Sequence, residues 1–446
     1  MPKKETIFYV CSNCGFETSS WSGKCFNCGE WNSLEEKVLI SSAKKSSKKL
    51  VVSKIKDNLN KDFKRLISGI DQIDAVMGGG IVPGSVILLA GQPGIGKSTV
   101  LLQLANAISK KNKVLYVSGE ESVHQISLRA KRLKIDTDNI EVASSNSADQ
   151  IAVNMSANDY QLVIVDSIQT VSCDNISSSA GSVSQITNST YLLSSIAKQR
   201  NIAIILVGHV TKEGNIAGPK VLEHLVDVVV HVEGDRYGGF KILRPVKNRF
   251  GSIEETGIFE MTEEGFRAVD NPSAALLSER QVSDGSVVFA TIEGNRPLLV
   301  EVQALVNRTS YGYPKRASSG IDLNRVNLLV AVLERRTKLK LSDMDIYINI
   351  VGGIRISEPA ADLAVCMAIA SATRGMQLKY DYVVFGEVGL SGEIRHVSFI
   401  EKRVSEAQKL GFDGTIGPSS KLSKEVSKHR VARDIKSALN QFLTKQ

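Results

Sequence analysis

Residues 91–99 read Gly-Gln-Pro-Gly-Ile-Gly-Lys-Ser-Thr, which is the complete GxxxxGK[ST] pattern of a phosphate-binding loop. In such a loop the glycines let backbone amides turn inward around the β-phosphate, Lys97 reaches the β and γ oxygens, and Ser98 ligates magnesium. The amides and the dipole of the helix that follows add to the same anion site. The pattern therefore predicts that the chain binds a nucleoside triphosphate through Gly91, Gln92, Pro93, Gly94, Ile95, Gly96, Lys97, Ser98 and Thr99.

Carboxylates follow two further apolar runs. Asp166 ends the run Leu162–Val165, as expected of a residue that holds magnesium together with Ser98. Glu120 and Glu121 follow the predicted strand Lys113–Val117, at the sheet edge where the γ-phosphate would lie. We expect Glu120 to polarise the attacking water and Glu121 to support it. Capping of the next helix is the alternative role for Glu121.

Three more polar residues are candidates for catalysis. His209 ends the predicted strand Ile202–Val207, from which it could sense the γ-phosphate, although a purely structural histidine is the alternative. Lys247 and Arg249 are two residues apart, so in an extended segment both point to one face. Such a pair could stabilise transition-state charge on a nucleotide, either that of its own chain or that of a neighbour.

Four of the six cysteines lie within the first thirty residues, in two CxxC pairs. Four thiolates suit tetrahedral zinc with no open position, so Cys11, Cys14, Cys25 and Cys28 predict a structural zinc site. Two disulfides are disfavoured in a cytoplasmic chain, and an iron–sulfur centre or a redox pair is the remaining alternative. Trp21 and Trp31 are expected to cover the metal site, with base stacking as the alternative.

The chain is expected to form more than one domain, each with its own hydrophobic core, because 446 residues exceed the size of an ordinary single domain. The 42% hydrophobic and 23% charged composition is that of a folded protein, with no apolar run long enough to cross a bilayer. The N-terminal segment lacks a secretory signal, so we expect a cytoplasmic protein. The net charge of +8 favours a polyanionic partner.

Short β-rich runs alternate with helical runs from about residue 63 to residue 261, which predicts a parallel sheet with crossover helices. A second α/β pattern without a phosphate loop follows residue 271. Between residues 41 and 56 there are six lysines and no acidic residue, which is typical of a flexible basic linker. The predicted divisions are a zinc module at 1–35, a linker at 36–62, an ATPase domain at 63–270 and a C-terminal domain at 271–446.

The order of these features resembles the bacterial RadA (Sms) family of DNA repair and recombination ATPases over essentially the whole chain. The residues that carry the resemblance are the four cysteines, Ser68-Gly69-Ile70-Asp71, Gly78-Gly79-Gly80, the phosphate loop, and Lys247-Asn248-Arg249-Phe250-Gly251. The implied fold is α/β: a RecA-like P-loop ATPase core with an N-terminal four-cysteine zinc module and a C-terminal Lon-protease-like domain.

The resemblance implies a DNA-dependent ATPase that uses ATP, Mg²⁺ and Zn²⁺ and acts in DNA repair and recombination after DNA damage. It implies translocation on single-stranded DNA and branch migration by a hexameric ring, in which Lys247 and Arg249 act across the subunit interface and Glu120 is the catalytic glutamate. The implied partners are single-stranded and branched DNA, a recombinase of RecA type, and a replicative helicase or primase. The implied location is the cytoplasm, on the nucleoid and not at a membrane.

The C-terminal region departs from the protease pattern that it resembles. Ala360 stands where the nucleophilic serine is expected, and Glu401 stands where the partner lysine is expected. A Ser-Lys dyad needs a hydroxyl and a basic amine, so we expect no protease activity. The domain is instead expected to be a scaffold with a basic DNA surface formed by Lys315, Arg316, Arg325, Arg335 and Arg336. An ATP-dependent protease and a nucleotide-controlled scaffold are the alternative functions.

Overall fold

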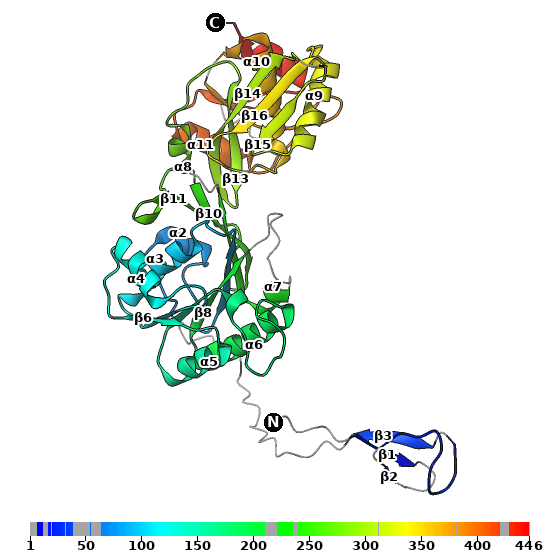
Figure 1. Ribbon diagram of the computed structural model, residues 1–446. Coiled ribbons are helices and arrows are strands. Elements are labelled where there is room, and N and C mark those ends of the chain that lie inside the picture. Colours follow the sequence, from blue (N-terminus) through cyan, green and yellow to red (C-terminus); the bar gives the residue numbers. More distant parts are fainter. Residues whose placement is uncertain are drawn as a thin grey trace. The chain divides into compact units, whose positions relative to one another are not determined.

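A computed structural model describes residues 7–11, 17–18, 20–31, 33–38, 54, 64–209, 221–234, 240–310, 312–379, 381–419 and 428–445 (Figure 1). Nearly all of the lysine-rich linker lies outside these residues. The chain divides into two compact units, Met1–Asp62 and Phe63–Gln446. In the part of the chain that the structure describes, no helix is long and apolar enough to span a membrane.

The first unit is a small antiparallel sheet. Its strands are β1 (Ile7–Cys11), β2 (Glu17–Thr18) and β3 (Leu34–Val38), in the order β2-β1-β3. Cys11, at the end of β1, packs with Cys25, Leu34 and Tyr9. Such a small apolar cluster cannot stabilise a fold by itself, so the unit depends on the metal that its cysteines are expected to hold.

The second unit begins with a nine-stranded sheet in the order β12-β11-β10-β9-β4-β8-β7-β5-β6. Six strands are parallel: β4 (Val86–Gly91), β5 (Val114–Ser118), β6 (Ile140–Ser144), β7 (Leu162–Asp166), β8 (Ala203–His209) and β9 (Val228–Gly234). Three antiparallel strands extend the sheet beyond β9: β10 (Phe240–Asn248), β11 (Gly257–Thr262) and β12 (Gly265–Ala268). The phosphate loop thus follows a central strand, and the expected parallel α/β core is confirmed.

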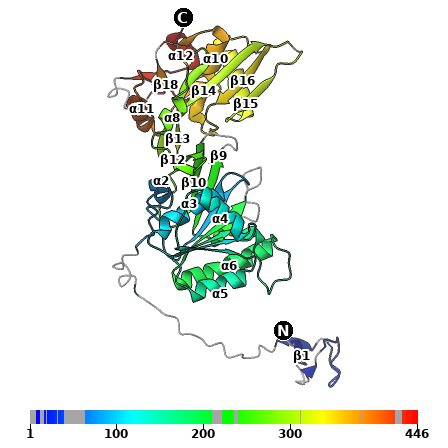
Figure 2. The same ribbon diagram turned by 60° about the vertical axis from the view of Figure 1, so that its left-hand side comes forward.

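Helices cover both faces of this sheet (Figures 1 and 2). They are α2 (Asp71–Val76), α3 (Lys97–Ser109), α4 (Val123–Arg132), α5 (Ala148–Ala157), α6 (Val183–Arg200) and α7 (Val221–Leu225), with a 3-10 turn, η1 (Ile168–Thr170). Alternate residues of β4 enter different cores: Ile87 and Leu89 pack with α2, α3 and α4, and Leu88 packs with α5, α6 and α7. A strand buried on both faces explains why this run is apolar throughout.

The C-terminal part contains a mixed seven-stranded sheet in the order β15-β16-β14-β13-β18-β21-β22. Its strands are β13 (Ser286–Glu293), β14 (Arg296–Arg308), β15 (Arg316–Ser319), β16 (Met344–Ile350), β18 (Tyr382–Val384), β21 (Gly414–Gly417) and β22 (His429–Val431). The helices around it are α8 (Pro272–Leu277), α9 (Leu323–Thr337), α10 (Asp362–Arg374), α11 (Ile400–Lys409) and α12 (Ile435–Phe442). The smaller elements are η2 (Pro359–Ala361), β17 (Gln377–Leu378), β19 (Glu387–Val388), β20 (Ile394–Arg395) and β23 (Leu443–Thr444).

The turn between β13 and β14 joins this sheet to the ATPase core. The hydroxyl of Thr256 donates to the carbonyl of Glu293 at 3.1 Å, and Arg244 on β10 forms an ion pair with the buried Glu293 side chain at 2.5 Å. Gly294 has φ +61°, and a Cβ atom there would lie 2.1 Å from the carbonyl oxygen of Glu254. Glycine is therefore required at this contact. The predicted domain boundary at residue 270 stays a prediction, because Phe63–Gln446 forms one compact unit.

Candidate functional site

The phosphate loop connects β4 to α3. Gly94 has φ +80° and Gly96, the residue before α3, has φ +108°, so both adopt the left-handed conformation that the pattern requires. A side chain at Gly96 would also collide with Met261 and Phe266, since a Cβ atom would lie 2.6 Å from each. The loop therefore needs glycine at this position for backbone conformation and for space.

The side chain of Lys97 is buried and folds back on its own loop. Its ammonium donates to the carbonyls of Gly91 at 2.9 Å and Gln92 at 3.0 Å. Burial lowers the pKa of Lys97, although the negative charges of Asp166 and Glu120 oppose this effect. A partly desolvated lysine beside the loop is suited to bind phosphate oxygens.

His209 connects this lysine to Glu120. Nζ of Lys97 lies 3.3 Å from Nδ1 of His209, and Nε2 of His209 lies 3.3 Å from Oε1 of Glu120. A lysine ammonium can only donate, so Nδ1 accepts and the ring proton belongs on Nε2, which donates to the carboxylate. The predicted residues Lys97, Glu120 and His209 thus lie together, at the carboxyl ends of the parallel strands.

Glu120 is held as a carboxylate. The hydroxyl of Ser167 donates to its Oε1 atom at 2.6 Å. Burial raises the pKa of Glu120, but the hydrogen bonds from Ser167 and His209 and the charge of Lys97 outweigh burial, so the pKa is lower than usual. Its side chain is 46% exposed, so water can reach it. These properties suit a group that orients or deprotonates water.

Glu121 has a different environment. Arg129 on α4 binds its carboxylate through both terminal nitrogens, one of them at 2.8 Å. The cap of α4 is Ser122, which accepts from Gln125 and forms a capping box with it, so Glu121 is not the helix cap. This bidentate pair makes Glu121 a support for the loop that carries Glu120.

Asp166 ends β7 and is buried. It accepts a hydrogen bond of 2.7 Å from the hydroxyl of Tyr116 on β5. Burial, followed by the charge of Asp166, raises the pKa of Tyr116 well above its ordinary value, so the tyrosine remains a donor. Asp166 and Ser98, the first residues to consider for Mg²⁺, both offer the oxygen ligands that this ion prefers.

The sequence did not single out Ser167, Tyr116 or Arg129 as site residues. Each belongs to a residue type that is common in any chain, and only the pairing of β5 with β7 brings Tyr116 and Asp166 together. Ser167 follows Asp166 directly, and a polar residue after the strand was the only available signal.

Lys247 and Arg249 lie at the opposite end of the parallel strands from the phosphate loop. Lys247 donates to the carbonyls of Glu223 at 2.6 Å and Val226 at 2.8 Å, and Arg249 donates to the buried Asp227 at 3.1 Å. Asp227 also accepts from the amide of Val86, the first residue of β4, whereas the phosphate loop follows the last. Because β4 spans roughly 17–20 Å, the pair cannot reach its own nucleotide.

Burial lowers the pKa of Lys247, with a further contribution from the positive charge of Arg249. The two cations bind consecutive residues immediately before β9, since Lys247 donates to Val226 and Arg249 donates to Asp227.

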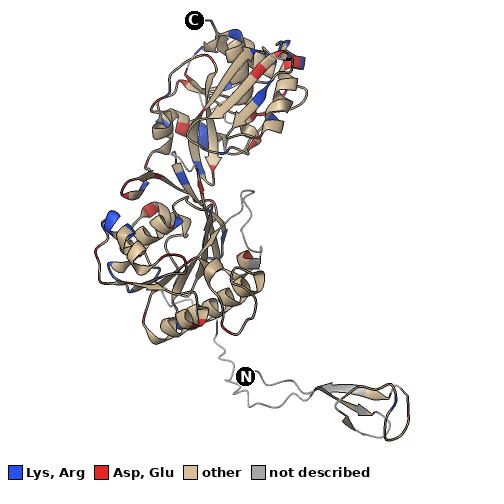
Figure 3. Cartoon of the chain, viewed as in Figure 1, with Lys and Arg blue, Asp and Glu red and all other residues tan. Residues whose placement is uncertain are grey.

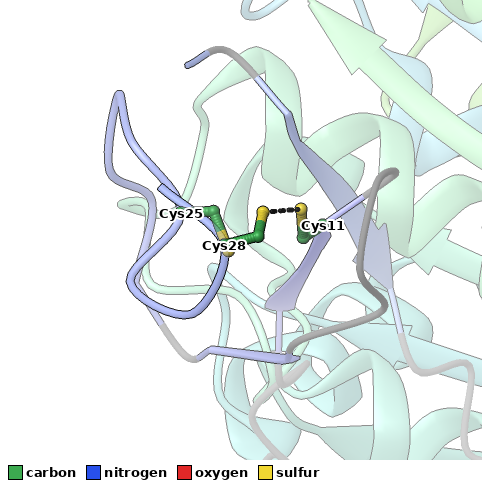
Figure 4. A group of neighbouring side chains, drawn as sticks. All are labelled: Cys11, Cys25 and Cys28. Carbon is green, nitrogen blue, oxygen red and sulfur yellow. Dashed lines mark hydrogen bonds between the residues drawn. The ribbon is translucent and has the colours of Figure 1, made fainter. Parts of the chain in front are cut away.

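Cys11, Cys25 and Cys28 gather in the first unit (Figure 4). Their sulfur atoms lie within 4.8 Å of one another, and those of Cys11 and Cys28 are 3.6 Å apart. Tetrahedral zinc with Zn–S bonds near 2.3 Å places its sulfurs about 3.8 Å apart, so the three thiols fit this ion. The predicted fourth ligand, Cys14, lies outside the described residues.

Trp21 and Trp31 are largely exposed. Their side chains are 60% and 70% exposed, and Phe26, in the same small unit, is 75% exposed, because a unit of this size has too little core to bury large rings. That the two tryptophans cover the metal site stays a prediction. Lys24 lies 5.8 Å from the centre of the Trp31 ring.

In the C-terminal part, Ala360 is buried and Glu401 is exposed. Lys402, the residue after Glu401, is engaged by the side chain of Asn295. The buried cation of this region is Arg403, which pairs with Glu358 at 2.6 Å. Neither residue at the expected dyad positions offers a hydroxyl or an amine.

The expected basic surface is only partly available. Arg325 forms an ion pair with Asp362, which is almost fully buried, and thereby joins α9 to α10. It therefore has a structural role, because its removal would leave a buried charge unpaired. Lys315, Arg335 and Arg336 are exposed.

Three models of known protein families match parts of the chain. They are described as an AAA domain, matching residues 53–215, a rubredoxin metal binding domain, matching residues 9–36, and subunit ChlI of Mg-chelatase, matching residues 323–421. A solved structure of an ATPase domain is similar to 48% of this chain and 94% of that chain, with a TM-score of 0.41 and 14% identity.

Curated proteins match nearly the full length. A protein of Aquifex aeolicus named "DNA repair protein RadA" is 45% identical over 94% of this chain and 95% of its own length. A protein of Bacillus subtilis with the same name is 47% identical over 93% of each chain.

Proposed function

The chain belongs to the RadA family of DNA repair proteins, and from this membership we propose that it is a DNA-dependent ATPase that moves along single-stranded DNA and drives branch migration. That the protein is a DNA repair ATPase follows from the family itself. The observation that best supports the proposed motor is the His209 bridge between Lys97, which binds phosphate, and Glu120, which meets water.

In the proposed reaction the phosphate loop and Lys97 hold the β- and γ-phosphates. Ser98 and Asp166 would hold Mg²⁺, which neutralises charge on these phosphates. Glu120 orients the attacking water and accepts its proton, and Ser167 keeps that carboxylate in place. Phosphate entering between Lys97 and His209 would change the hydrogen bond from His209 to Glu120, so occupancy of the site and readiness of the base are linked.

The active enzyme is proposed to be a ring, with a hexamer as the expected size. Lys247 and Arg249 lie too far from their own phosphate loop to act there, which supports action on the nucleotide of a neighbouring subunit. Cations placed there would stabilise negative charge that develops in the transition state.

The same proposal includes the partners that family membership implies. These are single-stranded and branched DNA, a recombinase of RecA type, and a replicative helicase or primase, on the nucleoid of the cytoplasm. The exposed residues Lys315, Arg335 and Arg336 are the remaining candidates for a DNA-binding surface in the C-terminal part. The C-terminal part is proposed to have no protease activity, since Ala360 and Glu401 cannot form a Ser-Lys dyad.

Measurement of ATP hydrolysis with and without single-stranded DNA, with casein digestion in parallel, tests the proposal. We expect hydrolysis to rise strongly with DNA and casein to remain intact. An equal rate with and without DNA would favour a nucleotide-controlled scaffold. ATP-dependent casein digestion that persists in protease-inhibitor controls would favour a protease.

A further inference from the structure

A cavity of about 800 Å³ adjoins the phosphate loop. One wall comes from Gln92 and Ile95 of the loop, and a second comes from β9 and β10, including His231 and Phe240. The third wall belongs to the C-terminal part, from the segments 318–321 and 353–355. Figure 2 shows β9 and β10 extending from the ATPase sheet toward the C-terminal part.

The order of the strands fixes which end of a nucleotide faces this cavity. β4, which leads into the phosphate loop, has β8 on one side and β9 on the other. Glu120, Asp166 and His209 follow strands on the β8 side, so the γ-phosphate and the attacking water belong there. The nucleoside is at the other end of the molecule, and the cavity lies on the β9 side of the loop, away from these three residues.

The walls have the chemistry that a purine nucleoside requires. Phe240 is partly exposed at the cavity, and the buried residues Ile95 and Ile354 line it from two other segments, so apolar groups meet there from three sides. Polar groups at the same walls can pair with the edges of a base and with the ribose. Among the described residues, Nε2 of His231 is buried without a hydrogen-bond partner, and the exposed Ser319 also lines the cavity. The volume lies within the roughly 300–1,000 Å³ of small-molecule sites.

The ion pair between Arg244 and Glu293 holds the walls together. Both residues line the cavity, and they belong to the ATPase sheet and to the C-terminal sheet respectively. Burial raises the pKa of Glu293 in spite of the opposing charge of Arg244. Movement of one wall would separate two charges that are largely shielded from water, which is costly.

We propose that this cavity binds the base and ribose of the bound ATP, so that the C-terminal part, through residues 318–321 and 353–355, forms the outer wall of the nucleotide site. This inference rests on the proposed ATPase and adds the place of its nucleoside. The C-terminal part would then contact the nucleotide directly. Binding and release of ADP would change the contacts of residues 318–321 and 353–355, whether or not a γ-phosphate is present.

The first test compares ADP with inorganic pyrophosphate, which keeps the phosphates and lacks the nucleoside. Ser319→Trp places a large ring in the cavity from an exposed position, and Ser391→Trp adds the same ring at an exposed position outside it. Calorimetry on the full-length protein should show ADP affinity falling roughly tenfold or more in Ser319→Trp, as expected for overpacking, with pyrophosphate affinity unchanged. Both affinities should be unchanged in Ser391→Trp.

Unchanged ADP affinity in Ser319→Trp would overturn the inference, as would an equal loss for ADP and pyrophosphate. Absence of binding of either ligand to the unaltered protein would instead contradict the proposed ATPase. A second test uses no variant: photolabelling with 8-azido-ADP should attach to residues 316–325. Labelling confined to residues outside the C-terminal part would overturn the inference.

Discussion

At the level of single residues, the adjacent glutamates Glu120 and Glu121 differ in their hydrogen-bond partners and therefore in their roles. Glu121 is held by both nitrogens of Arg129, whereas Glu120 contacts only the hydroxyl of Ser167 and the imidazole of His209 and stays open to water. The guanidinium satisfies one carboxylate completely and leaves the other available for chemistry. The difference is invisible in the sequence, where both residues follow the same strand.

We predict that Glu120→Gln lowers ATP turnover by roughly 10²–10⁴-fold, because the amide cannot accept a proton, while nucleotide affinity is retained. The matched variant Glu121→Gln should lower turnover only a few-fold by loosening the contact with Arg129. Steady-state hydrolysis and ADP titration measure both. The reverse order of severity would transfer the role of base to Glu121.

The pH dependence of ATP turnover at acid pH should agree with the assignment of Glu120 as the base. The pKa of Glu120 is lower than its ordinary value of 4.5, so its carboxylate is charged throughout the neutral range. Protonation of Glu120 should therefore reduce turnover only below about pH 4.5. Loss of activity that begins nearer neutrality would have to come from another group.

At the scale of the element, the strands that carry the site are apolar throughout because helices cover both faces of the sheet. β5, β7 and β8 end in the polar residues Ser118, Asp166 and His209. β10 turns back along β9 and carries Lys247 and Arg249 to the other end. The phosphate loop therefore lies at one end of the parallel strands, and Lys247 and Arg249 lie at the opposite end.

This separation predicts complementation between subunits. Lys97→Ala chains lose their own phosphate site but keep Lys247 and Arg249, and Arg249→Ala chains keep the site but lose one of these two cations. Mixed rings should regain some ATP turnover at interfaces that combine an intact phosphate site with both cations, while each variant alone stays inactive. No recovery in rings shown to be mixed would count against action on the neighbour.

Sequence reasoning found the elements with strong periodicity and missed those without it. The predicted strand Leu162–Val165 is present and ends one residue later, at Asp166. α6 begins at Val183, because Ser182 caps it by accepting from the amide of Gln185. β6 and α5 were not predicted, since β6 is only partly buried and its composition is mixed.

Among site residues, the sequence identified those whose type is tied to one chemistry, such as Lys97 in its glycine loop. It did not identify the residues that act through distant pairing. The contact of Tyr116 with Asp166 spans fifty positions of sequence and depends on strand register. The ion pair of Arg244 with Glu293 depends on packing between two sheets, for which periodicity carries no signal.

At the scale of the whole molecule, the chain combines a small unit that holds the cysteine cluster with a large unit that has its own cores. Lysines and arginines are interspersed with acidic residues along the ribbon of the large unit (Figure 3). The net charge of +8 is concentrated in the lysine-rich residues 41–56, which hold six lysines and no acidic residue.

Removal of the metal should affect the two units differently. We predict that Cys25→Ser, or chelation, releases about one zinc ion per chain and unfolds the first unit, whose stability comes from the metal. Thermal unfolding of the large unit and its basal ATP hydrolysis should be unchanged. Metal analysis and calorimetry measure these effects, and Cys366→Ser, in the large unit, is the control for metal content. A lower unfolding temperature of the large unit would contradict the prediction.

The exposed rings of the first unit have a practical consequence. Trp21 and Trp31 are the only tryptophans in the chain, and both belong to the unit that holds the cysteine cluster. Indole emission from the intact protein therefore originates entirely in that small unit. Quenching or a spectral shift on addition of any ligand would report an event there, with no need for an attached dye.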